Sequence, residues 1–133
     1  MALSSFLTGL MRYFPRAKGR PKMNIIVVNL KFTPLHNAIY IGRKHYSKKH
    51  GLLEESPLAN PFVIGRDGSR AEVLEKYKNW LLSQITQTSS PALQELLRLR
   101  NILLSAQTLT LACWCKPEAC HGDILADILS RAR

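Results

Sequence analysis

The hydrophobic positions of the chain fall into two kinds of run, short continuous ones and longer ones with a helical period. Two continuous runs, NIIVVNL at 24–30 and AIYIG at 38–42, have the β-branched residues and the length of buried strands. A third run, TLTLACWC at 108–115, alternates less regularly and also predicts a strand. We expect these three segments to form the sheet of the protein.

Three other segments predict helices. Ser69 and Glu72 have the spacing of a capping box, and the apolar stripe that follows them predicts a helix over residues 70–85. A second helix is predicted from Pro91, which follows a serine cap and suits the first helical position. The last predicted helix, GDILADILSRAR at 122–133, carries its apolar residues on one face.

The order of these elements, β, β, α, α, β, α, predicts an α/β fold with a small, mostly parallel sheet flanked by helices, a Rossmann-like sandwich. The chain has 133 residues, the length of one ordinary domain, and we assign residues 23–133 to a single domain. In open sheets of this kind, ligands bind at the carboxyl ends of the strands and beside helix N-termini. The loops after the second and third strands are therefore the two candidate segments for a site.

The loop after the second strand, RKHYSKKHGLLEESPLANPF at 43–62, is rich in Lys, His and Pro. Pro57 and Pro61 interrupt any helix or strand ladder, so an irregular loop is expected, and loops of this length are usually functional or mobile. Arg43 could form paired hydrogen bonds to a phosphate. The Asn60 amide could bind a base or an amide group, or could instead bond its own backbone in a turn.

The remaining histidines and aromatic residues have simpler interpretations. His45 and His50 have no spacing that indicates metal binding, and we expect them to be solvated. Tyr77, Trp80 and Trp114 are better placed for the core than as a stacking platform for bases. Neither group adds a candidate site.

Positive charge is concentrated in the first part of the chain. Residues 1–50 contain ten Lys or Arg and no Asp or Glu, whereas residues 51–133 contain nine of each sign. This skew favours an anionic partner for residues 1–50, such as phosphate, nucleic acid or an acidic membrane surface, although a solvated basic tail has the same composition. No apolar run approaches the roughly 20 residues of a membrane span, so we expect a soluble protein.

The segment before the first strand, residues 1–22, has apolar residues at helical spacing and ends in a basic stretch rich in Pro and Gly. We interpret it as a dispensable basic extension, with translation starting at Met23 and the protein in the cytoplasm. The alternative is an organelle-targeting peptide, because the segment contains Arg and Ser and no acidic residue. It lacks the long apolar segment and the cleavage site of a secretory signal.

The loop after the third strand, CWCKPEACHG at 113–122, contains every cysteine of the chain. On a strand, Cys113 and Cys115 would present their sulfurs on the same face. They are not expected to bridge each other, because one intervening residue strains a disulfide. Cys120 and His121 would lie at the N-terminus of the last helix, whose dipole would lower the pKa of the Cys120 thiol.

Three interpretations of this segment stay open. By ligand type it matches a Cys₃His zinc set, Cys113, Cys115, Cys120 and His121, although its spacing differs from the common C-x₂₋₄-C pairs and would need a sharp bend that Gly122 permits. Alternatively, Cys115 or Cys120 is a nucleophile with His121 as its base, or Cys113 and Cys115 form a redox couple. In the third interpretation, the cysteines are small core residues and His121 caps the helix.

Several of these motifs together resemble a known family. YIGR, SPLANPF, the EKYKNWL helix and LACWCKPEACHGDIL, which span roughly residues 39–129, are similar to the bacterial and phage family called domain of unknown function 4326. The combination of SPLANPF with CWCKPEACHG is specific, whereas neither motif alone would be. The resemblance implies a compact α/β domain and no particular activity. In the commonest form of the family a Gly precedes the Asn of SPLANPF, where this chain has Ala59.

Two functions are compatible with these observations. The first is a small enzyme or binding domain for a nucleotide or another phosphate-bearing ligand. Its binding residues would be Arg43 and Asn60, and its reactive residues Cys115, Cys120 or His121. The second is a nucleic-acid-binding module stabilised by zinc, whose basic residues 1–50 contact phosphates. The expected meeting of two loops at one sheet edge favours the first function.

Overall fold

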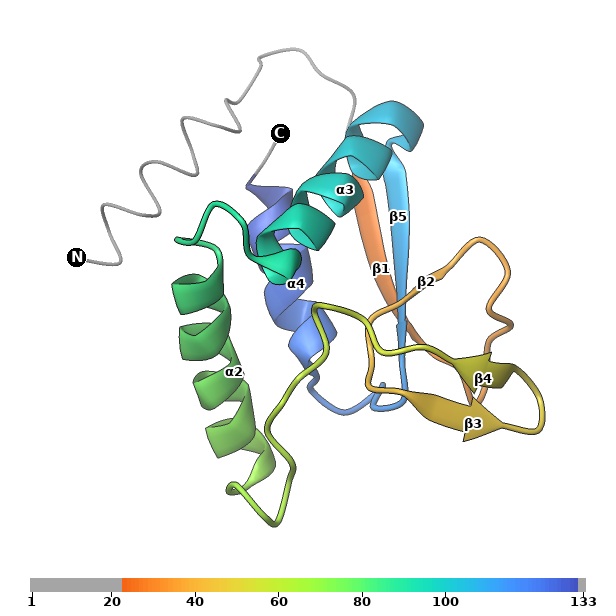
Figure 1. Ribbon diagram of the computed structural model, residues 1–133. Helices are drawn as coiled ribbons and strands as arrows, with labels where there is room; N and C mark the ends of the chain where they lie inside the picture. Colours follow the sequence, from red (N-terminus) through yellow and green to blue (C-terminus); the bar gives the residue numbers. More distant parts are fainter. Residues whose placement is uncertain (1–22, 132–133) are drawn as a thin grey trace.

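The main sheet is built around the last strand of the chain. The structure is a computed structural model and describes residues 23–131. Strand β5 (Thr108–Cys113) lies between β1 (Asn24–Asn29) and β2 (Ile39–Tyr40), and both pairings are parallel (Figure 1). The predicted α/β class and parallel sheet are therefore confirmed, and the third strand ends two residues earlier than predicted.

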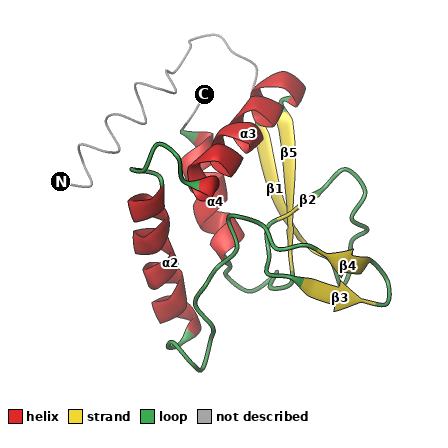
Figure 2. Cartoon of the chain, viewed as in Figure 1, coloured by secondary structure: helices red, strands yellow, loops and turns green. Residues whose placement is uncertain are grey.

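The helices α2 (Arg70–Gln84), α3 (Pro91–Ala106) and α4 (His121–Ser130) all lie on one side of this sheet (Figures 1 and 2). Alternation along β5 explains the arrangement, because Leu109 and Leu111 face the helices in the main core. The opposite face carries the small residue Ala112, which packs against loop residues and not against a helix. Within residues 23–131, helices thus flank the sheet on one face only, whereas a Rossmann-like sandwich has helices on both.

The predicted helix caps are confirmed. The Ser69 hydroxyl accepts a hydrogen bond from the Glu72 amide at 3.2 Å, and the Glu72 carboxylate accepts one from the Ser69 amide at 2.9 Å. The Ser90 hydroxyl accepts from the Leu93 amide at 3.2 Å, with Pro91 at the start of α3. Helix α2 ends at Gln84, one residue before the predicted end.

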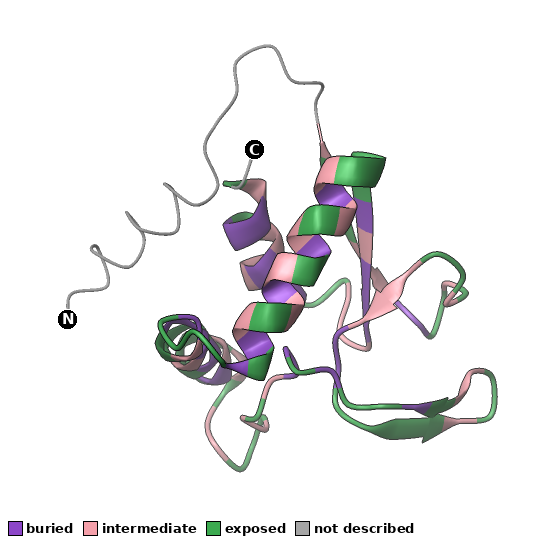
Figure 3. Ribbon diagram, turned by 45° about the horizontal axis from the view of Figure 1, so that its top comes forward, coloured by how far each residue is buried: buried purple, intermediate pink, exposed green. Residues whose placement is uncertain are grey.

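The other side of the sheet carries a small antiparallel hairpin, β3 (His45–Ser47) and β4 (Gly51–Leu53). The prediction of an irregular loop over 43–62 is wrong for these residues. Each strand has only three residues, and the paired residues Tyr46 and Leu52 are 70% and 56% exposed. The sequence therefore contains no buried hydrophobic run that would predict the hairpin. Figure 3 shows that much of the hairpin surface is exposed.

The predicted basic extension, residues 1–22, lies outside the described residues, as does the end of the last predicted helix at 132–133. The same holds for the proposed amphipathic helix and for half of the basic residues of the segment 1–50. Within residues 23–131, none of the helices has the length and apolar character needed to cross a membrane.

Candidate functional site

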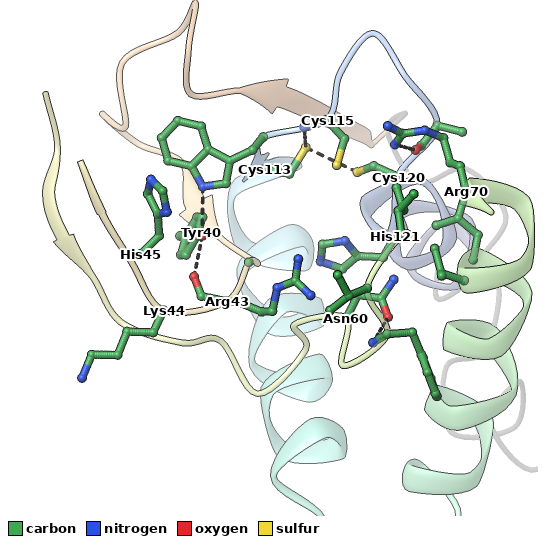
Figure 4. Close-up of a pocket in the computed structure, with 18 residues that line it drawn as sticks. Tyr40, Arg43, Lys44, His45, Asn60, Arg70, Cys113, Cys115, Cys120 and His121 are labelled. Atoms are coloured by element: carbon green, nitrogen blue, oxygen red, sulfur yellow. Dashed lines mark hydrogen bonds between the residues drawn. The ribbon is translucent and has the colours of Figure 1, made fainter. Parts of the chain in front are cut away.

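A cavity of about 410 Å³ opens at the carboxyl end of β5 (Figure 4). Its volume falls in the range of small-molecule sites, about 300 to 1,000 Å³. The cavity lies where the loops after β2 and β5 meet the start of α2. All six residues predicted from the sequence line it: Arg43, Asn60, Cys113, Cys115, Cys120 and His121. The sheet edge inferred from the order of elements is therefore where the two loops come together.

The turn that carries the cysteines is held by Asn29, a buried residue at the end of β1. Its side-chain Nδ2 donates to the Trp114 carbonyl at 3.2 Å and to the Lys116 carbonyl at 2.6 Å. Its Oδ1 accepts from the Lys31 amide at 2.8 Å. Sequence reasoning missed Asn29, because nothing local in NIIVVNL shows that its amide reaches a turn at the other end of the chain.

Gly122 brings the start of α4 close to the sheet. A Cβ added at this position would lie 2.8 Å from Val27 Cγ1 and 3.0 Å from Ile41 Cδ1. The predicted role of Gly122, a bend that lets Cys120 and His121 share a metal, is replaced by this close approach. The helix N-terminus, and with it the sulfur of Cys120, therefore sits directly against the carboxyl ends of the strands.

The three thiols of the turn contact one another. The Cys120 thiol donates to the Cys113 sulfur at an Sγ–Sγ distance of 3.3 Å, and the Cys115 amide donates to the same sulfur at 3.5 Å. Cys120 is the N-cap of α4, since its sulfur accepts from the Gly122 amide at 3.2 Å. Cys113 and Cys120 are buried, whereas Cys115 is half-buried and faces the cavity. We call these three residues the thiol cluster.

The thiol cluster favours one negative charge on Cys115. Interactions with Cys113 and with Cys120, followed by one with Arg70, lower the pKa of the Cys115 thiol and outweigh the effect of burial. The hydrogen bond to Cys115 raises the pKa of Cys113, and contacts with both other cysteines raise that of Cys120. The prediction that the pKa of Cys120 is lowered is therefore not matched, because its contacts with the other two cysteines raise it, and the lowered pKa belongs to Cys115.

His121 is buried and has its own partner. Its Nε2 lies 2.7 Å from the Ile41 carbonyl, which can only accept, so Nε2 carries a proton. The ring meets Tyr77 edge to face at a centroid distance of 5.1 Å. Burial lowers the pKa of His121, and the ring is neutral near pH 7 with Nδ1 as its remaining acceptor. Cys120, and not His121, caps the helix.

The geometry of the four predicted zinc ligands does not support the zinc prediction. Two sulfurs bound at 2.3 Å to a tetrahedral zinc would lie about 3.8 Å apart, whereas the Cys113 and Cys120 sulfurs are in hydrogen-bond contact at 3.3 Å. Nε2 of His121 is already bonded to a carbonyl. In residues 23–131, no group of three or more His, Cys, Asp or Glu side chains is arranged to hold a metal ion.

Three positively charged residues are among those that line the cavity. The Arg43 guanidinium points toward His121 and Asn60, Arg70 lies beside the thiol cluster, and Lys44 extends away from both (Figure 4). Arg70 Nη1 also donates to the Ala119 carbonyl at 2.9 Å, which ties α2 to the turn. Sequence reasoning missed Arg70, because it is far in sequence from the cysteines and was read only as the start of a helix.

Asn60 forms the predicted turn interaction and also lines the cavity. Its Oδ1 accepts from the Phe62 amide at 2.9 Å, which is the turn interaction expected of an Asn before a Pro. The other end of the amide, its Nδ2 donor, is left for the cavity that the residue lines.

Aromatic side chains form the remaining wall of the cavity. Trp114, predicted to be a core residue, is half-buried and lines the cavity, while its Nε1 donates to the Tyr40 hydroxyl at 3.0 Å. The Tyr40 hydroxyl in turn donates to the Arg43 carbonyl at 2.6 Å. His45, predicted to be solvated, contacts the indole at a centroid distance of 4.9 Å. Tyr77, by contrast, is fully buried as predicted.

Comparison with known proteins adds a family and no activity. No curated protein and no solved structure matches the chain. Residues 28–131 match the family described as domain of unknown function (DUF4326), a segment that contains β2, β5, the hairpin, the last two residues of β1 and the whole cavity lining. The resemblance noted in SPLANPF and CWCKPEACHG is thereby confirmed, and the chain belongs to the DUF4326 family.

Proposed function

We propose that the cavity binds a small phosphate-bearing ligand, with a mononucleotide as the favoured class, and presents the Cys115 thiolate to it. The observation that carries the proposal is the composition of the lining. Arg43, Lys44 and Arg70 are among the lining residues, and none of the described residues that line the cavity is an Asp or Glu. A cleft lined by charges of one sign attracts ligands of the opposite sign.

Arg43 is the first candidate for phosphate binding. Its side chain is exposed and directed into the cavity, and its guanidinium can form paired hydrogen bonds to phosphate oxygens. Its backbone is fixed by the Tyr40 hydroxyl, so the side chain starts from a defined position. Arg70 carries the second positive charge. Because it lies beside Cys115, it would reduce the repulsion between the thiolate and an anionic ligand.

The uncharged part of the lining suits the rest of a nucleotide. Trp114 and Phe62 offer apolar surface on which a base or sugar could pack, and the Asn60 Nδ2 donor could bind a carbonyl or ring nitrogen. The cavity also lies at the carboxyl end of a parallel sheet beside the N-terminus of α4, where α/β folds commonly bind nucleotides.

Cys115 is the residue best suited to react with a bound ligand. It lines the cavity, and interactions with Cys113, Cys120 and Arg70 lower its pKa. A thiolate is a strong nucleophile at neutral pH, whereas the protonated thiols of Cys113 and Cys120 are not.

Calorimetric titration of the reduced full-length protein with nucleoside mono-, di- and triphosphates tests this proposal. Arg43→Ala should weaken binding by about tenfold to a hundredfold, because a hydrogen bond to a charged group contributes about 1.5 to 3 kcal/mol. Arg98→Ala is the matched control, since Arg98 is exposed on α3 and pairs with Glu95 outside the cavity. Binding of nucleosides as tight as that of their phosphates, or equal loss in both variants, would contradict the proposal.

A zinc-stabilised nucleic-acid-binding module is the alternative proposal. The observation in its favour is the meeting of three sulfurs at one turn, together with the exposed Lys31, Lys48 and Lys49 among the described basic residues. It requires about one equivalent of zinc in the purified protein, and an affinity for DNA or RNA that falls steeply with salt and on removal of residues 1–22. Metal-free protein with salt-independent binding would exclude this alternative.

A further inference from the structure

We propose that Cys115 and Cys120 form a peroxide-responsive thiol pair, in which a hydroperoxide oxidises Cys115 and Cys120 then closes a disulfide with it. This activity needs no nucleotide, so it goes beyond the function proposed above and can fail or succeed independently of it.

Access to the thiol cluster runs through Cys115. Cys113 and Cys120 are 1% and 2% exposed, whereas Cys115 is half-buried and lines the cavity (Figure 4). A small oxidant entering the cavity therefore meets Cys115 first. The two buried thiols are shielded from direct oxidation.

The surroundings of Cys115 suit a peroxide-reactive cysteine. Arg70 and Cys120 line the cavity beside Cys115 (Figure 4), and Cys113 accepts a hydrogen bond from the Cys115 amide at 3.5 Å, so a positive charge and two further thiols lie next to its sulfur. Oxidation to a sulfenic acid favours cysteines that combine thiolate character, solvent access and a nearby second thiol. The thiol cluster supplies all three properties within one turn.

The reaction balances with the hydroperoxide as the only oxidant. The Cys115 thiolate attacks one peroxide oxygen and the O–O bond breaks, which gives Cys115 sulfenic acid and an alkoxide or hydroxide. This leaving group takes up from solvent the proton that Cys115 released on ionisation and departs as an alcohol or water. The Cys120 sulfur then attacks the sulfenic sulfur, and the S–O bond breaks. The departing hydroxide takes the Cys120 thiol proton and leaves as water, so two thiols have lost two electrons to the hydroperoxide.

Cys120 is the better resolving partner because of its place in the chain. One residue separates Cys113 from Cys115, a spacing that strains a disulfide. Cys120 comes from the far side of the turn, and its sulfur contacts both other cysteines. The closing step would also remove the negative charge that Arg70 faces.

Peptide mapping of the intact, reduced full-length protein after treatment with hydrogen peroxide tests the proposal. Cleavage after Trp114 separates Cys113 from Cys115, and cleavage after Glu118 separates Cys115 from Cys120. The expected product is a peptide pair linked through Cys115 and Cys120. A linkage through Cys113, or Cys115 sulfinic acid without any disulfide, would overturn the proposal.

Variants separate the two steps. Cys120→Ser should accumulate a sulfenic acid that a 1,3-dione reagent traps, whereas Cys113→Ser should still form the disulfide. Arg70→Ala should slow the loss of free thiol, and Arg98→Ala, an arginine on α3 outside the cavity, should leave the rate unchanged. Circular dichroism checks that each variant is folded. Equal rates in the two arginine variants, or rapid oxidation of Cys115→Ser, would contradict the assignment of Cys115 as the site of attack.

Discussion

The two walls of the cavity differ in how firmly the rest of the protein holds them. The cysteine wall, residues 113–121, continues from the central strand, is bonded by Asn29 and leads into a helix packed in the core. The loop wall, residues 40–64, includes the exposed hairpin and the side chains of Arg43 and Lys44. The three thiols, whose mutual distances must stay fixed, lie on the buried wall, whereas Arg43 and Asn60, which would bind a ligand, lie on the exposed one. This division suits a site whose reactive groups need fixed positions and whose binding loop can adjust to the ligand.

The largest expected difference between the walls is in core packing. Leu125 in α4 is fully buried behind the cysteine wall, whereas Leu52 in the hairpin is 56% exposed. Leu125→Ala should lower the free energy of unfolding by about 2 to 5 kcal/mol through the cavity it leaves. Leu52→Ala should change it by about 0.5 kcal/mol or less. Urea unfolding measures both, and similar losses would show that the two walls are equally supported.

The next effect concerns the anchor of the cysteine wall. Asn29→Ala should lower the free energy of unfolding by about 1 to 3 kcal/mol, because the Trp114 and Lys116 carbonyls lose their donor. It should also change the rate at which Cys115 reacts with an alkylating reagent. Asn101→Ala, an exposed position on α3, is the control. Unchanged Cys115 reactivity in a destabilised Asn29 variant would mean that the turn keeps its shape without this anchor.

A pH effect should also arise from the cysteine wall. Burial lowers the pKa of His121 below its ordinary value of 6.5. Between the two pKa values, His121 is therefore protonated in the unfolded chain and neutral in the folded protein. Stability should be greatest above about pH 6.5 and should fall below it, until the pH reaches the folded pKa, with a slope of at most about 1.4 kcal/mol per pH unit. His121→Gln should remove this slope, whereas the exposed His36→Gln should keep it. Urea unfolding at several pH values distinguishes the two.

The smallest expected effect on stability comes from the loop wall. Arg43→Ala should change the free energy of unfolding by about 0.5 kcal/mol or less, because its side chain is exposed and the Tyr40 bond uses its carbonyl. The same variant should lose affinity for a phosphate-bearing ligand. A large loss of stability in Arg43→Ala would show that the loop wall has a structural role.

Much of the fold could be predicted from local signals. Capping residues and helical periodicity located the three helices, and most of the predicted helix ends lie within about one residue of the observed ones. Ser69, Ser90 and their partners are informative because they act within one turn of chain. The hairpin was missed, since Tyr46 and Leu52 face outward and give no buried pattern. The placement of all helices on one face was also missed, because periodicity identifies an apolar face and not the surface that it covers.

The candidate site was located by the order of the elements, and its chemistry was predicted less well. The carboxyl end of the central strand indicated where Arg43, Asn60 and the cysteines would meet. The sequence could not show which thiol has a lowered pKa, because this depends on contacts among three sulfurs and on Arg70. It also could not show that His121 is bonded to Ile41, since that contact joins the last helix to the second strand.

The central position of β5 has a consequence for how the protein is made. Among the strands that the structure describes, β1 and β2 pair with β5 alone, and β5 follows all the others in the sequence. Neither strand has a hydrogen-bonding partner in the sheet until residues 108–113 have left the ribosome. A nascent chain therefore holds two unpaired strands and two amphipathic helices through most of its synthesis, a state that exposes apolar surface to aggregation and to chaperones. A chain that is released before Thr108 lacks the central strand of the sheet. We expect such a truncated chain not to fold and to be degraded.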